Sequence, residues 1–192
     1  VANLGLHPTF LDDFCQLEEI KRQIRDEDPV AIGEIGMDFH HVKEESEREE
    51  QERVFRELLE LAEDLDKPVV VHTRSAERQC VDILKEYELP GIMLHCFNGE
   101  PELAAEAVEN GMKIGVTTQV LYSTRVQNIV RELELDHILL ETDSPFLYRG
   151  ERNEPVNVVE SAHKIAELKD REFSDVVESS TRNAAELFMV DV

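Results

Sequence analysis

The sequence lacks any apolar run that approaches the ~20 residues needed to cross a bilayer. Its first ten residues, VANLGLHPTF, lack the basic segment and long apolar stretch of a signal peptide. They also lack an initiator Met, and we expect the chain to begin part-way through a longer protein. The first absence argues against a transmembrane segment in this sequence, and the second indicates that these ten residues are not a signal peptide.

Cysteine is sparse as well. Cys15, Cys80 and Cys96 are the three cysteines, and they show no CxxC spacing. An odd, scattered set of this kind argues against a disulfide framework and for a reducing compartment. We therefore expect a cytoplasmic protein.

Basic residues are scarce relative to acidic ones. Lys and Arg number 20 against 43 Asp and Glu, which gives a net charge of −23. The acidic residues are spread over every predicted helix, so they predict an acidic, solvated surface. Such a surface suits a salt-rich cytoplasm, where the screening length falls to ~3 Å at 1 M salt. Halophily is one hypothesis for the charge, and an ordinary acidic cytosolic protein is the alternative.

Short β-branched segments alternate with longer segments of helical periodicity. Strands are expected at 30–36, 67–72, 91–97, 112–118 and 137–143, with residues 1–6 as the end of a further strand and helices at 156–168 and 174–188. The strands are almost wholly apolar, which is typical of parallel sheets covered on both faces. GxGxxG and GxxxxGK[ST] are absent, which argues against a nucleotide-binding open sheet. The pattern predicts one α/β domain over residues 1–192.

Polar residues lie at the carboxyl ends of four predicted strands: Glu34, His72, His95 and Asp143. In an α/β barrel these ends face one rim, where active sites are built. Taken alone, each residue has a structural alternative. Either His could be a buried, hydrogen-bonded residue, and either carboxylate could cap a helix. Together, two imidazoles and two carboxylates favour a divalent-metal site.

Neighbouring residues extend this prediction. If the strands continue, Glu141 shares a face with Asp143, and Arg74 shares one with His72. We expect Glu141 to orient a metal ligand, and Arg74 either to hold a phosphate oxygen or to form a structural salt bridge. His7 either lines the rim as a substrate contact or fixes its loop.

Several segments resemble the TatD family of metal-dependent deoxyribonucleases. They run in order through nearly the whole chain: GLHP (5–8), GEIGMDF (33–39), PVVVHTRSA (68–76), LHCFNG (94–99), ILLETDSPFL (138–147), RNEP (152–155) and TRNAAELF (181–188). The resemblance implies a TIM-type (β/α) barrel of the metal-dependent hydrolase kind, with two divalent metal ions at the carboxyl rim. Mg²⁺ is the expected ion, with Zn²⁺ or Mn²⁺ as alternatives.

The same resemblance implies roles for the strand-end residues. Glu34 is a shared metal ligand, His72 and His95 are further ligands, and Asp143 is a ligand that also handles the proton. Glu34 and Asp143 are thus the expected catalytic residues. The implied activity is hydrolysis of phosphodiester bonds in DNA, single-stranded or at 3′ ends, and often in the 3′ to 5′ direction.

One departure from the family pattern stands out. The family begins with a His-x-His pair on its first strand, and this sequence contains no HxH. We expect a barrel that is incomplete at its N-terminus and lacks its first βα unit. Open barrel edges favour pairing with another chain, so a homo-oligomer is expected.

The charge leaves alternative functions open, because −23 repels DNA at low salt. A related metal-dependent deacylase or amidohydrolase that acts on a small substrate is the second hypothesis. A non-catalytic, shortened homologue that acts in assembly is the third.

Overall fold

A computed structural model describes residues 2–191. Within that range strands and helices alternate along the chain, as the sequence predicted. The chain divides into two compact units, residues 1–94 and 95–192. The single domain expected over residues 1–192 stays a prediction.

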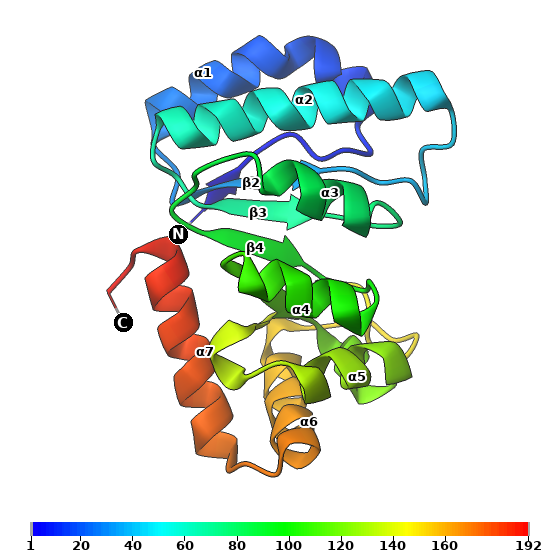
Figure 1. The fold of residues 1–192 in the computed structure, drawn as a ribbon, viewed down its shortest axis with the longest axis vertical. Coiled ribbons are helices and arrows are strands. Elements are labelled where there is room, and N and C mark those ends of the chain that lie inside the picture. The colour runs from blue at the N-terminus through cyan, green and yellow to red at the C-terminus, as the bar shows by residue number, and fades with distance from the viewer. Residues whose placement is uncertain (1, 192) are drawn as a thin grey trace. The chain divides into compact units, whose positions relative to one another are not determined.

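The first unit is a parallel sheet with helices beside it (Figure 1). Its strands follow the order β1 (Asn3–Leu4), β2 (Ala31–Gly36), β3 (Val69–His72) and β4 (Ile92–His95). Its helices are the 3₁₀ helix η1 (Leu11–Gln16), α1 (Leu17–Glu27), α2 (Glu45–Asp64) and α3 (Glu77–Leu84). Helices α1 and α2 lie side by side, and α2 packs on β2.

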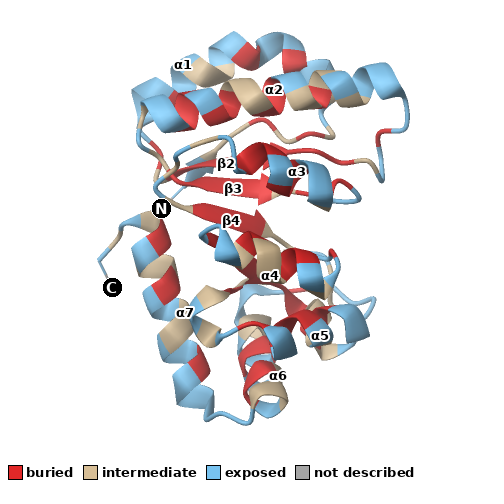
Figure 2. Ribbon diagram, in the orientation of Figure 1, coloured by how far each residue is buried: buried red, intermediate tan, exposed pale blue. Residues whose placement is uncertain are grey.

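The apolar stripe of α2 explains that packing. Phe55, Leu58, Leu59 and Ala62 recur at helical spacing, and all four are fully buried. Figure 2 shows the buried residues on the strands and along one side of the helix, with exposed residues on the other side. The acidic residues of α2 therefore lie on its solvent face, as the composition predicted.

The second unit pairs β5 (Met112–Val116) with β6 (Ile138–Leu140) in parallel. Its helices are α4 (Pro101–Glu109), η2 (Thr118–Leu121), α5 (Thr124–Glu132), η3 (Leu135–His137), η4 (Pro155–Asn157), α6 (Val158–Lys169) and α7 (Phe173–Phe188). Helix α4 contacts β5, α7 contacts β6, and α6 contacts α7.

Strand β6 ends earlier than the sequence predicted, and β3 ends at the predicted residue. β6 ends at Leu140 and β3 at His72, so Asp143 and Arg74 both lie in loops. Asp143 has a φ of 57°, which is left-handed backbone and not a strand conformation. The expectation that strand alternation sets the faces of Glu141 and Arg74 was therefore wrong, since a period of two requires extended backbone.

No helix in the described part of the chain is long and apolar enough to cross a membrane.

Candidate metal centre

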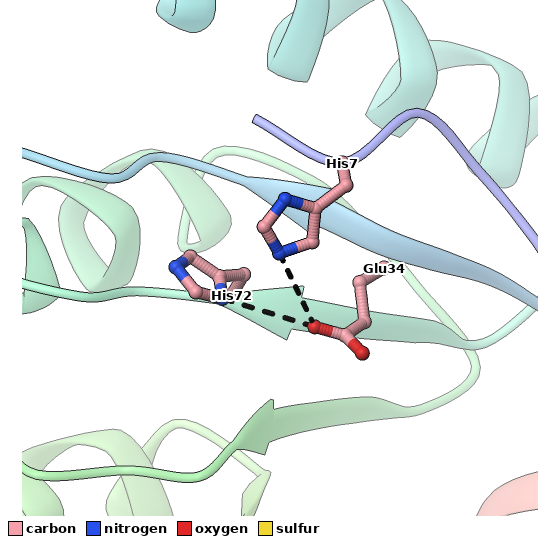
Figure 3. A group of neighbouring side chains, drawn as sticks. All are labelled: His7, Glu34 and His72. Atoms are coloured by element: carbon pink, nitrogen blue, oxygen red, sulfur yellow. Dashed lines mark ion pairs between the residues drawn. The ribbon is translucent and has the colours of Figure 1, made fainter. Parts of the chain in front are cut away.

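Three side chains of the first unit converge at the ends of its strands (Figure 3). His7 Nε2 and His72 Nδ1 each lie 3.7 Å from Glu34 Oε2. One ligand atom from each of the three residues lies within 4.8 Å of the other two. The sequence predicted Glu34 and His72 as ligands of one site, and predicted His7 either as a substrate contact at the rim or as a residue that fixes its loop.

The backbone of β2 directs Glu34 into this group. Gly33 pairs with Val70 on β3 and Ile35 pairs with Val71, so Glu34 falls at a shift of register. A bulge of this kind re-aims a side chain. Gly36 closes the same segment with a φ of 132°, and a Cβ built there would lie 2.1 Å from the His72 carbonyl oxygen. Only glycine allows β2 to approach His72 so closely.

Each imidazole has its other nitrogen held by a hydrogen bond. His7 Nδ1 lies 2.8 Å from Thr9 Oγ1. His72 Nε2 lies 2.9 Å from Asp38 Oδ2. His7 Nδ1 also accepts a hydrogen bond from the Thr9 NH at 3.3 Å. The Asp38 carboxylate only accepts, so it fixes the orientation of His72 and places the proton of the neutral ring on Nε2. These hydrogen bonds leave His7 Nε2 and His72 Nδ1 directed at Glu34.

Asp38 was not among the site residues predicted from the sequence. Its side chain is completely buried and also accepts hydrogen bonds from the His41 backbone NH, at 2.7 Å, and from His41 Nδ1, at 2.9 Å. Burial opposes ionisation, but the bonds from His72 and His41 outweigh it and hold the pKa of Asp38 below its usual range. A carboxylate inside the apolar segment IGMDF was a usable signal, because such a group needs partners.

The electrostatics of His72 follow from the same contacts. Burial favours the neutral imidazole, but hydrogen bonds to Asp38 and Glu34 stabilise the cation and raise the pKa of His72 above its ordinary value. The site thus concentrates negative charge around this ring.

This donor set fits a divalent cation. Two imidazole nitrogens and a carboxylate oxygen are ligands that Zn²⁺ and related ions accept. Ligand atoms ~2.0–2.2 Å from one ion lie about 3–3.5 Å apart at tetrahedral or octahedral angles. The observed 3.7 Å separations need only a small contraction to meet that range.

The second unit carries a similar group, formed by His95, Glu141 and Asp143. His95 Nε2 lies 3.6 Å from Asp143 Oδ1, and His95 Nδ1 hydrogen-bonds Glu141 Oε2. The Cys96 backbone NH donates to Glu141 Oε1 at 2.6 Å, which fixes the Glu141 carboxylate. Glu141 thus contacts the imidazole next to Asp143, although it follows the end of β6, and its orienting role stays a prediction.

Arg74 lies just beyond β3 and is exposed. Its carbonyl oxygen accepts a hydrogen bond from the Phe39 NH at 2.9 Å, which holds its backbone against the segment that follows β2. Its charge is the largest cause of a lowered pKa at His40. Arg74 thus places a positive charge two residues after His72 in an otherwise acidic chain.

A family model described as TatD related DNase matches residues 1–189. The chain belongs to the TatD family. It is 36% identical to the uncharacterized metal-dependent hydrolase YabD of Bacillus subtilis, over 99% of this chain and 78% of YabD. It is 39% identical to the human deoxyribonuclease TATDN3, over 83% of this chain and 60% of TATDN3.

A solved structure agrees with these sequence matches. YjjV, a TatD homolog of Escherichia coli K12, superposes with a TM-score of 0.87 at 30% identity, over 99% of this chain and 77% of YjjV. The predicted family and the predicted α/β fold class are therefore confirmed, and the chain is of the metal-dependent hydrolase kind. The roles of individual residues, and the expectation that Glu34, His72, His95 and Asp143 share one site, stay predictions.

Proposed function

We propose that this TatD-family chain hydrolyses phosphodiester bonds of DNA, removing nucleotides from the 3′ end of a single strand. One observation carries the proposal. Each of three imidazoles has one nitrogen held by a hydrogen bond and the other directed at a carboxylate oxygen, 3.6–3.7 Å away. This arrangement is typical of histidines prepared for metal. The name of the human relative, deoxyribonuclease, supports DNA as substrate.

Five side chains are proposed to hold two divalent cations, with Mg²⁺ expected: His7, Glu34 and His72 in the first unit, and His95 and Asp143 in the second. A bound divalent cation supplies Lewis acidity, which lowers the pKa of water and neutralises charge on a phosphate. Including His7 extends the ligand set inferred from the sequence, and its contact with Glu34 is the reason.

Asp143 is proposed to accept the proton of the attacking water. Its carboxylate is one-third exposed, so water reaches it, and its neighbour His95 is fixed by Glu141. As the water oxygen bonds to phosphorus, the proton passes to Asp143 and the bond to the leaving 3′ oxygen breaks. Arg74, exposed and fixed through its backbone, is proposed to donate to a nonbridging phosphate oxygen.

The net charge of −23 favours a second candidate function. A small substrate meets less long-range repulsion than DNA does. The same donors would serve deacylation or amide hydrolysis of a small molecule equally well, because the attack on a carbonyl needs the same proton acceptor.

The test is the initial rate of the purified full-length gene product on a panel of substrates with Mg²⁺. The panel comprises end-labelled single-stranded DNA, duplex DNA, and small acyl and amide compounds. We expect shortening of single strands from the 3′ end, and a loss of at least ~10² in rate for Asp143→Asn. Turnover of small compounds alone would favour the second candidate. Failure to bind any divalent ion would favour a non-catalytic homologue.

A further inference from the structure

The loop between β6 and α6 exposes a large aromatic side chain close to Asp143. Phe146 is 65% exposed, and Tyr122, at the end of η2, is 47% exposed. A single exposed apolar residue is ordinary on a protein surface and carries no argument by itself. What distinguishes Phe146 is how firmly its loop, residues 144–153, is held.

A buried asparagine fixes this loop from inside. Asn153 is 2% exposed, and its Nδ2 lies 2.7 Å from the carbonyl oxygens of Thr142 and Phe146 and 2.9 Å from Thr118 Oγ1. Thr118 Oγ1 in turn donates to the Leu147 carbonyl oxygen at 2.6 Å. Both ends of the loop are thus hydrogen-bonded to one buried amide. The backbone that carries the exposed Phe146 side chain is therefore held in place.

The same contacts bring the second aromatic residue to the loop. The Tyr122 hydroxyl donates to the Leu147 carbonyl oxygen at 3.3 Å. Tyr122 therefore lies beside the residue that follows Phe146. Two exposed rings at one rigid junction give flat apolar surface that is already ordered before a ligand binds, which reduces the entropic cost of binding.

A backbone turn links Phe146 to Asp143. The Phe146 NH donates to the Asp143 carbonyl oxygen at 2.8 Å, which closes a tight turn. Such a turn keeps its end Cα atoms within about 7 Å of each other. A base stacked on Phe146 would therefore lie next to the phosphate on which Asp143 is proposed to act.

Charge favours a nucleic acid over an apolar partner. Residues 144–153 carry Arg149 and Arg152 against Glu151 alone, so the loop has a positive balance in a chain of net charge −23. Aromatic rings beside cationic side chains are what proteins use to hold single-stranded nucleic acid, because every base has a face to stack.

We propose that Phe146, with Tyr122 beside the residue that follows it, stacks against a base that flanks the scissile phosphate of single-stranded DNA. This rests on the proposed function. The contact positions the substrate and selects unpaired bases, because a paired and stacked base does not offer a free face. It also offsets, at short range, the repulsion between the acidic chain and DNA.

The test compares two oligonucleotides with the full-length gene product. The first oligonucleotide has all of its bases, and the second lacks the two bases that flank the 3′-terminal phosphodiester. We expect Phe146→Ala to raise KM at least about 5-fold on the first, the lower bound for one stacked base. On the second its kinetics should equal those of the wild type. Phe146→Tyr should restore the wild-type KM. Phe173→Ala, which removes an exposed ring from the start of α7, is the matched control.

An equal loss on both substrates, or no loss on either, would overturn the proposal. Wild-type protein that cleaves neither oligonucleotide would contradict the proposed function instead. In that case the quenching of 2-aminopurine at the 3′ end decides the base contact, since it is measured without turnover. Quenching by the wild type that Phe146→Ala abolishes supports stacking, and its absence in the wild type refutes it.

Discussion

Asp38→Asn is the sharpest perturbation of the metal centre, because it preserves shape and reverses one hydrogen bond. The Asp38 carboxylate accepts from His72 Nε2, which leaves His72 Nδ1 unprotonated and directed at Glu34. An Asn amide placed there donates to Nε2. The proton of a neutral His72 then moves to Nδ1, the nitrogen that a cation would need.

The expected magnitude follows from the position of Asp38. Replacing the partner of a metal-binding histidine typically weakens metal binding 10–100-fold, which is about 1.4–2.7 kcal/mol. Asp38 is completely buried, so solvent does not screen its loss. Losing hydrogen bonds to a buried charge lowers the free energy of unfolding by about 1–3 kcal/mol.

Calorimetric titration of metal-free protein with Mn²⁺ or Zn²⁺ measures the first effect. His41→Ala is the matched control, because it removes the other partner of Asp38 and leaves His72 in place. We expect a 10–100-fold weaker affinity for Asp38→Asn and a much smaller change for His41→Ala. Equal affinities for wild type and Asp38→Asn would refute the inferred tautomer.

The pH dependence of the metal-free proteins gives a second check on the same pair. The lowered pKa of Asp38 contributes stability that is present above the unfolded value of about 3.9 and lost as pH falls through the folded pKa. The raised pKa of His72 contributes stability that is present below about 6.5 and lost as pH rises through the folded pKa. The difference in Tm between wild type and Asp38→Asn should therefore be largest near pH 5–6 and smaller at pH 9.

Three further predictions use separate measurements. Gly36→Ala should abolish folding or lower Tm sharply, because its Cβ would meet the His72 carbonyl oxygen at 2.1 Å; an unchanged melting curve would contradict the close approach. Glu141→Gln should weaken metal binding while leaving Tm of the metal-free protein within a few degrees, since His95 loses only a charged partner; unaltered binding in calorimetry would remove its orienting role. Tm of metal-free protein should climb from dilute buffer to molar KCl if the −23 charge is a salt adaptation, and a flat or falling Tm would reject halophily.

The fold was predictable because its strands are buried on both faces. Residues 68–71 are apolar and are followed by His72, and β3 occupies Val69–His72. The order of strands and helices followed from such segments and from the stripes between them. Strand ends were less predictable. Cys96, for example, has left-handed backbone directly after β4, and no glycine or proline marks that position.

The candidate ligands were predictable because polar residues interrupt apolar segments at matching places. Their immediate partners were less so. Asp38 hydrogen-bonds His72, which lies 34 residues further along the chain, and the sequence does not show that these two side chains meet in space. His7 approaches Glu34 because glycines allow close strand packing, with a Cβ on Gly5 only 2.8 Å from the Gly33 carbonyl carbon. Both contacts depend on the tertiary fold of the chain and not on the local sequence pattern.

A cation held by these side chains is proposed to be required for phosphodiester hydrolysis. The most direct test is the initial rate of single-stranded DNA cleavage as Mn²⁺ is titrated into metal-free full-length protein. We predict no cleavage without metal, a rate that rises with occupancy and saturates, and a titration shifted to at least ~10-fold higher Mn²⁺ for Glu34→Gln, whose wild-type carboxylate lies between His7 and His72. Full cleavage by metal-free protein, or superimposable titrations for wild type and Glu34→Gln, would contradict the account.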